Sequence, residues 1–294
     1  MIAQEIGNRS DLLSLRASNP RRYPALLESS SCDADFAQGR WDILFAFPQH
    51  SLTAEMDGDL PTGGEQFLQS LQQARLAAFD ALQHTAVETL QAQFVDDIGV
   101  PLPFTGGWFI YLAYEMAAAV EPVLKLPACD DGAPLAHAVR IPCAVLHDRK
   151  SDRRWIVGEM GQAANCMQIA DDLDEAEAVE APSISVVNQS EAQPDSFKSA
   201  VVSAKQYIVD GDIFQANLSR IWNAELASGS AADLFQRLRT SNPAPFSAFA
   251  DLPGASIISS SPERLIRQRG DTIDTRPIAG TRRRGATDAE DAEL

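Results

Sequence analysis

Four short segments within residues 245–278 constrain the fold of this chain more than any other feature. In chain order they are PFSAFADL, ASIISSS, RLIRQRG and DTIDTRPI, and each has the composition of a short β-strand. Gly254 separates the first two, and Gly270 with Asp271 separates the last two. Glycine at such places favours tight turns between antiparallel strands. The sequence therefore predicts a β-meander here.

Helical spacing of apolar residues appears in three other stretches. One covers Phe67–Leu82, and another covers 197–208 and is followed by Gly211 as a stop signal. The third begins at Ser230, with Asp233 placed three residues later as in a capping box, and predicts a short helix. Further strands are predicted in WDILFAFP, RIPCAVLHDRK, RRWIVGEM and DIFQANLSRIW. GGWFIYLAYEMA is predicted to be a buried strand, or a strand that runs into a helix. The fold class expected is α+β.

The chain divides by composition into three parts. Residues 1–157 form an N-terminal region of apolar runs separated by turn signals, and 195–294 form a second region with sharper motifs. Between them, 158–194 is acidic and poor in aromatic residues, which predicts a helix around 163–179 and then a solvated linker. The carboxylates of this part lack the spacing of a calcium-binding loop.

Charge and cysteine usage exclude several functions. A net charge of −17 argues against non-specific binding to nucleic acid or to an anionic membrane. No run approaches 18 consecutive apolar residues, so no transmembrane helix is predicted.

The cysteines form no CxxC pair and the histidines are isolated, so no metal site of these residues is predicted. We expect reduced thiols in a cytoplasmic protein. The four cysteines are Cys32, Cys129, Cys143 and Cys166.

Two kinked segments carry the residues best suited to chemistry. SSSPERL (Ser259–Leu265) and TRPIAGT (Thr275–Thr281) each combine small residues with a proline, which lets a backbone approach a ligand closely. Glu263 lies in the first, where partial burial would suit it for proton transfer. The alternative is that Glu263 forms an ion pair with an arginine at a strand end.

A hairpin with its turn at 267–271 would bring the two kinks together. Leu265 and Ile266 would then lie opposite Thr275 and Arg276, and Glu263 would face the segment 277–279. The result would be a pocket for an anionic small molecule. The arginines 282–284 are interpreted mainly as a solvated basic turn.

Several long motifs of the chain resemble those of the chorismate-utilising enzymes. In the second half they are AKQYIVDGDIFQANLS, RTSNPAPFSAF, IISSSPERLI and TRPIAGTRRRG, and in the first half RRYPALLESS, GRWDILFAFP and LPFTGGWFIYLAYE. The first-half text is most similar to component I of aminodeoxychorismate synthase. The resemblance implies an anthranilate-synthase-like β-sandwich with flanking helices. It also implies that the C-terminal part of the fold lies beyond residue 294.

The resemblance further implies a reaction. Chorismate would be aminated with ammonia to 4-amino-4-deoxychorismate on the way to p-aminobenzoate and folate, with ammonia supplied by a glutamine amidotransferase subunit. Glu263 would be the general acid that protonates the departing hydroxyl, and Ala279, Gly280 and Thr281 would line the substrate pocket. The family uses Mg²⁺, whose ligands are expected beyond residue 294, so none is assigned in this chain.

Ala279 departs from the pattern of one group of aminodeoxychorismate synthases. That group has a lysine nucleophile at this position, and alanine forms no covalent intermediate. Two alternatives stay open: anthranilate synthase component I of tryptophan biosynthesis, and a non-catalytic protein that binds tryptophan or an amidotransferase.

An L-tryptophan pocket is also implied by the resemblance. Its residues could instead simply pack the core of the sandwich. They are Ser29, Gln38, Gly39, Arg40, Trp41, Pro245, Phe246 and Ser247.

Overall fold

The computed structural model describes residues 1–7, 10–31, 39–55, 63–83, 102–127, 131–176, 183–275, 277, 283 and 285–293. These residues belong to two compact units, one made of Met1–Val179 with Leu238–Leu294 and the other of Glu180–Arg237. No helix among the described residues is long and apolar enough to cross a membrane.

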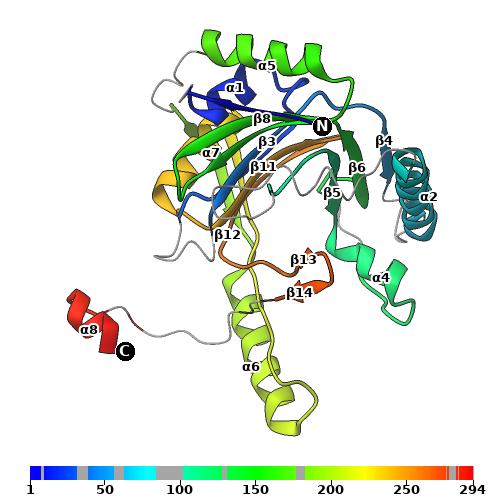
Figure 1. Cartoon of the computed structure of the whole chain (residues 1–294). Coiled ribbons are helices and arrows are strands. Elements are labelled where there is room, and N and C mark those ends of the chain that lie inside the picture. The colour runs from blue at the N-terminus through cyan, green and yellow to red at the C-terminus, as the bar shows by residue number, and fades with distance from the viewer. Residues whose placement is uncertain are drawn as a thin grey trace. The chain divides into compact units, whose positions relative to one another are not determined.

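A seven-stranded antiparallel sheet organises the first unit (Figure 1). Two neighbours come from opposite ends of the chain, because β11 pairs with β2 and places Ala248 beside Leu27. The β11–β12 pair of the second half therefore completes a sheet that the first half begins. In spatial order the strands are β1 (Ile2–Ile6), β8 (Arg153–Gly158), β7 (Cys143–Asp148), β3 (Trp41–Ala46), β2 (Ala25–Glu28), β11 (Phe246–Leu252) and β12 (Ala255–Ser261).

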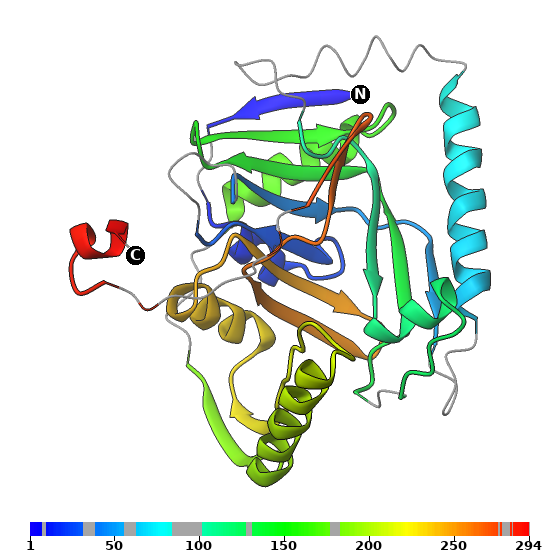
Figure 2. The same cartoon turned by 90° about the horizontal axis from the view of Figure 1, so that it is seen from below.

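A smaller sheet packs against one face of the large one. Its strands, in the order β4 (Ser51–Ala54), β6 (Ala136–Ile141) and β5 (Gly107–Leu112), are antiparallel. Phe45 of β3 and Ile141 of β6 share one buried apolar cluster, which joins the two sheets. Helix α2 (Gly64–Gln83) lies beside this smaller sheet, as Figure 2 shows in cyan. A 3₁₀ turn (Tyr114–Met116) and α4 (Ala117–Val120) follow β5.

Helices cover the other face of the large sheet. Helix α1 (Leu12–Ser18) begins at Asp11, whose side chain accepts a hydrogen bond from the Leu13 amide. Helix α5 (Ala163–Glu175) packs on β7 and β8 through an apolar stripe of Cys166, Ile169 and Leu173. The helix expected around 163–179 is thus present. Its apolar stripe docks it on the sheet, despite its acidic composition.

The second unit contains one long helix and one strand pair. Helix α6 (Pro194–Asp210) ends at Gly211, whose φ of 84° is left-handed, as the sequence predicted. Strand β10 (Trp222–Ser228) pairs with β9 (Ser185–Glu191). The strand predicted in DIFQANLSRIW is wrong for 213–221, which is irregular, because pairing with β9 begins only at Trp222. Helix α7 (Ala231–Ser241) begins at the predicted capping box.

The four strands predicted in 245–278 are present, but the single meander expected of them is wrong, because β12 does not pair with β13. β11 and β12 join the large sheet, whereas β13 (Arg267–Arg269) and β14 (Thr272–Asp274) form a separate hairpin. Its register pairs Arg267 with Asp274 and Arg269 with Thr272. A final helix, α8, spans Asp288–Glu293.

Candidate functional site

A cavity of about 460 Å³ opens at the end of the large sheet, within the range usual for small-molecule sites. Residues of β2, β3, the β11 start and the β13–β14 hairpin contribute to its wall. It gathers every described residue of the predicted tryptophan pocket, whereas Gln38 lies outside the described residues. The lining residues are Leu27, Glu28, Ser29, Gly39, Arg40, Trp41, Ile43, Pro103, Pro245, Phe246, Ser247, Arg264, Arg267 and Arg269.

The cavity's floor is apolar. Leu27 and Ile43 are cross-strand partners on β2 and β3, so their side chains emerge side by side. Trp41 continues the same face of β3 and packs on Trp155, with ring centroids 5.9 Å apart. A flat or ring-shaped apolar group would therefore meet complementary surface here.

Ser29 ties together the three segments that meet at the cavity. Its amide donates to Asp42 Oδ1 at 2.8 Å, which fixes the end of β2 against β3. Its hydroxyl lies 3.0 Å from the Trp41 carbonyl oxygen and 3.2 Å from that of Pro245, both acceptors. Because Ser29 is buried, this bonding gives it a structural role whatever the cavity binds.

Arg40 is held at the cavity edge by a buried carboxylate. Its Nε donates to Asp148 Oδ1 at 2.9 Å and its Nη2 to Oδ2 at 2.8 Å, the two-pronged geometry that arginine favours. Burial works against ionisation of Asp148. The hydrogen bonds from Arg40, Ser151 and the Lys150 amide outweigh burial and hold the pKa of Asp148 below its usual value.

A second ion-pair network lies behind the cavity. Arg239 Nη1 donates to Glu28 Oε2 at 2.9 Å, and the same guanidinium pairs with Asp11. Burial disfavours the charged form of Asp11, but hydrogen bonding and charge from Arg239 keep its pKa lowered. Arg149 Nε binds Asp42 Oδ1 at 2.8 Å. The carboxylate of Glu28, which also lines the cavity, is therefore already engaged.

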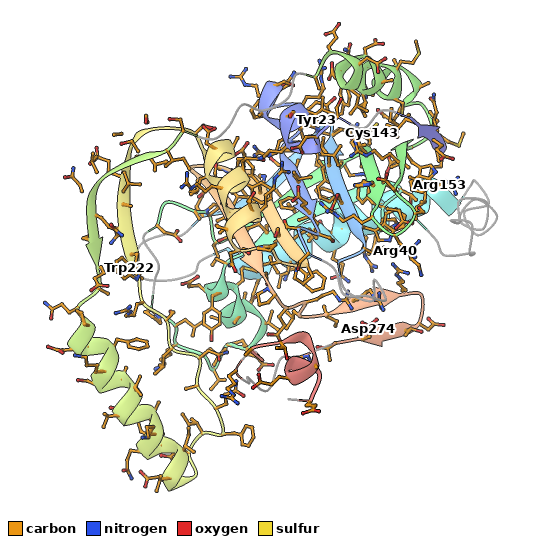
Figure 3. The ribbon with its side chains drawn as sticks, turned by 90° about the vertical axis from the view of Figure 1, so that its left-hand side faces the viewer. Tyr23, Arg40, Cys143, Arg153, Trp222 and Asp274 are labelled. Carbon is orange, nitrogen blue, oxygen red and sulfur yellow. The ribbon has the colours of Figure 1, made fainter. Side chains whose placement is uncertain are left out.

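The β13–β14 hairpin forms a cationic rim. Arg267 Nε donates to Asp274 Oδ2 at 2.7 Å, and Arg264 Nη2 donates to Asp274 Oδ1 at 2.9 Å. Arg269 lies on the same hairpin face as Arg267, two residues apart. Figure 3 shows Arg40 on the side of the sheet toward the hairpin that carries Asp274. The sequence motifs did not predict a role for these three arginines, although Arg267 and Arg269 have the i, i+2 spacing of one strand face.

The predicted catalytic segment flanks this hairpin. Glu263 lies between β12 and β13 and is exposed rather than partly buried, because neither strand covers it. The predicted alignment of the hairpin arms is supported by Thr275, whose hydroxyl donates to the Leu265 carbonyl at 2.7 Å. Ala279, Gly280 and Thr281 lie outside the described residues.

No group of three or more His, Cys, Asp or Glu side chains in the described part of the chain is arranged to hold a metal ion. The acidic residues nearest the cavity are instead bound to arginines, as Asp148 and Asp274 are. These carboxylates lack the free oxygen ligands that Mg²⁺ prefers.

Comparison with known sequences gives one family. The profile described as chorismate binding enzyme matches residues 29–294. An anthranilate synthase component I-like protein of Synechocystis sp. is 34% identical over 66% of this chain and 40% of its own length. Aminodeoxychorismate synthase component 1 of Bacillus subtilis is 32% identical over 65% of this chain and 43% of its own. Anthranilate synthase component 1 of Cereibacter sphaeroides is 34% identical over 74% of this chain and 47% of its own length. The chain spans less than half the length of these relatives.

Solved structures show the same fold. Anthranilate synthase component I of Streptococcus pneumoniae superposes with a TM-score of 0.56 at 22% identity, covering 80% of this chain and 53% of that one. MenF, the menaquinone-specific isochorismate synthase of Escherichia coli, gives 0.53 at 13% identity, covering 100% of this chain and 57% of its own. The expected α+β sandwich of the anthranilate synthase type is thus confirmed.

Proposed function

The chain belongs to the chorismate-binding enzyme family, and from this premise we propose that the full-length protein is component I of an enzyme that aminates chorismate. The product proposed first is 4-amino-4-deoxychorismate, the precursor of p-aminobenzoate and folate. Support comes from the N-terminal text GRWDILFA, which is most similar to aminodeoxychorismate synthases, and from the relative of that name in Bacillus subtilis.

In the proposed reaction ammonia replaces the C4 hydroxyl of chorismate, and one water molecule leaves. Hydroxide is a poor leaving group, so a general acid must protonate it. Glu263 is proposed as that acid, since it is the carboxylate of the Ser-Pro-Glu segment. Ala279 offers no nucleophile, so ammonia would reach the ring without a covalent link to this position.

The observation that best supports a site here is the alignment of the hairpin arms. Arg267 pairs with Asp274, and the Thr275 hydroxyl reaches the Leu265 carbonyl one step beyond the ladder. Continued in this register, Glu263 would face the segment that begins at Pro277. The proposed acid and the proposed substrate-binding backbone would then form facing walls.

A second candidate is anthranilate synthase component I. Ala279 matches the residue found in those enzymes, and relatives named anthranilate synthase include those of Cereibacter sphaeroides and Spirochaeta aurantia, 34% and 31% identical. The two candidates share the same substrate and ammonia source and differ in the ring carbon that is aminated.

The proposal includes a glutamine amidotransferase subunit as the ammonia donor, because relatives are named component I. It includes Mg²⁺ through the family resemblance, with ligands outside this chain's described residues. L-tryptophan is the ligand that the resemblance suggests for the cavity beside Ser29 and Trp41.

Product analysis of the full-length protein with chorismate, an ammonium salt and Mg²⁺ tests the proposal. We expect 4-amino-4-deoxychorismate, which a lyase then converts to p-aminobenzoate. Anthranilate fluorescence without a lyase would instead establish the second candidate. Glu263→Gln should abolish turnover while leaving chorismate binding measurable. A wild-type protein that binds but never turns over would favour a non-catalytic binding protein.

A further inference from the structure

Two free cysteines meet in the layer between α5 and the large sheet. Cys143 begins β7 (Figure 3) and Cys166 lies near the start of α5, and their side chains are 0% and 5% exposed. Both sulfurs lie beside Gly158 of β8, the cross-strand partner of Cys143. A Cβ on that glycine would be 2.6 Å from Cys166 Sγ and 3.4 Å from Cys143 Sγ. The absence of a side chain at Gly158 therefore lets the two sulfurs approach each other.

This pair of thiols lies close to the protein surface. Met167, the residue after Cys166, is 69% exposed, and Gln162, one helical turn before Cys166, is half-buried. Gln162 lies beside the pair, because its Oε1 is 3.9 Å from Cys143 Sγ and its carbonyl oxygen accepts from the Cys166 amide at 2.9 Å. Displacement of the Gln162 side chain would therefore expose the pair to a small solute.

The two thiols differ in acidity. A hydrogen bond from the Cys143 thiol to the Cys166 sulfur raises the pKa of Cys143, and burial raises it further. The same hydrogen bond lowers the pKa of Cys166, against the opposing effect of burial. Because the thiolate is the reactive form of cysteine, Cys166 is the member of the pair that attacks first.

We propose that Cys143 and Cys166 form a site of oxidative modification, at which a small peroxide converts the two thiols to an intramolecular disulfide that ties α5 to β7. Disulfides of proteins in reducing compartments are usually transient and respond to oxidants. The inference goes beyond the proposed amination and does not depend on it, since neither cysteine lines the cavity beside Trp41.

The reaction consumes one peroxide molecule for each disulfide. The Cys166 thiolate attacks one peroxide oxygen, the O–O bond breaks, and the departing hydroxide takes up the thiol proton as water. The sulfur of Cys143 then attacks the sulfenic acid on Cys166. This step forms the S–S bond and breaks the S–O bond, and the hydroxyl leaves with the Cys143 proton as a second water. The two thiols lose two electrons in all, and the peroxide gains them.

Peptide mapping of the folded protein tests the proposal, after stoichiometric hydrogen peroxide and alkylation of the remaining thiols. Trypsin places the two cysteines in separate peptides, 141–149 and 155–198, so a disulfide between them gives a single linked mass. We expect this linked peptide in native buffer and its loss after dithiothreitol. Alkylation of both cysteines, pairing with Cys32 or Cys129, or a linked peptide that forms only in urea would overturn the proposal.

Serine variants in a Cys32→Ser/Cys129→Ser background then assign the order of attack. Cys143→Ser keeps a hydrogen-bond donor but cannot resolve the sulfenic acid, so dimedone should trap that acid on Cys166. In Cys166→Ser we expect trapping on Cys143 to be at least about tenfold slower, which corresponds to one pKa unit. Equal rates would overturn the assigned order. The mapping of the wild type does not depend on whether these variants fold, and no turnover is measured, so failure here is distinct from failure of the proposed amination.

Discussion

Arg239, near the end of α7, binds Glu28 of β2 across 2.9 Å, although 211 residues separate them in the chain. The Glu28 side chain is only 6% exposed, and Arg239 is its closer cationic partner, since Arg149 lies 3.8 Å away. Arg239→Ala would leave that carboxylate buried without its main cation, and we expect a loss of about 3 kcal/mol in the free energy of unfolding. Urea denaturation measures it.

The control for this prediction is Arg153→Ala. Arg153 and Glu5 also form a close pair, but their side chains are 30% and 49% exposed. Exposed pairs contribute at most about 1 kcal/mol. Similar losses in the two variants would show that burial of Glu28 does not set the cost.

Ionised Asp148 should contribute to the free energy of unfolding, and this contribution should be lost in acid. Its pKa is lower in the folded protein than the value of about 3.9 for an unperturbed aspartate. Its contribution is therefore fully present above about pH 4 and is lost as the pH falls through the folded pKa. Asp148→Asn lacks this component. The stability difference between wild type and variant, measured by denaturation from pH 7 to pH 3, should narrow below about pH 4. A difference that stays constant over this range would contradict the assignment.

Gly158 has no room for a side chain. A Cβ there would lie 2.6 Å from Cys166 Sγ and 3.4 Å from Cys143 Sγ, in the layer between α5 and the large sheet. Gly158→Ala should therefore destabilise the protein by about 1–3 kcal/mol, the usual cost of overpacking. The shift in thermal midpoint measures this. Gly7→Ala, where nothing lies within 4 Å, should be nearly neutral.

A double variant identifies the clash. Cys166→Ala removes the nearest sulfur, so Gly158→Ala should cost less in that background than in the wild type, giving a measurable interaction between the two sites. Strictly additive effects would place the strain elsewhere.

Local sequence signals predicted many of the elements of this fold, but not how they assemble. The apolar stripe of α6, its stop at Gly211 and the strand content of β3, β7 and β8 follow from residues close in sequence. The pairing of β11 with β2 could not be inferred this way, because it joins segments more than 200 residues apart. Strand β9 was missed because its polar composition resembles a linker, and only its pairing with β10 makes it a strand.

The candidate site shows the same limit. The family motifs placed Ser29, Trp41 and Phe246 around one pocket, and the structure gathers them at one cavity. The sequence did not predict a role for the arginines of the β13–β14 hairpin, because each alone resembles an ordinary exposed cation. Their importance arises only where the hairpin brings them beside Arg40.

The capping box at the start of α7 should control local opening of that helix. Ser230 Oγ accepts from the Asp233 amide at 3.2 Å, while Asp233 Oδ2 accepts from the Ser230 amide at 2.8 Å. Ser230→Ala removes the first bond and should cost about 1 kcal/mol, which speeds hydrogen exchange of the Asp233 amide about fivefold. Ser230→Gly should cost only a few tenths of a kcal/mol, because glycine is also tolerated at the N-cap position of a helix. Lys198→Ala, at an exposed pair on α6, serves as the control and should leave this amide unchanged. An Asp233 amide that exchanges equally fast in Ser230→Ala and wild type would show that the serine hydroxyl does not hold the helix start.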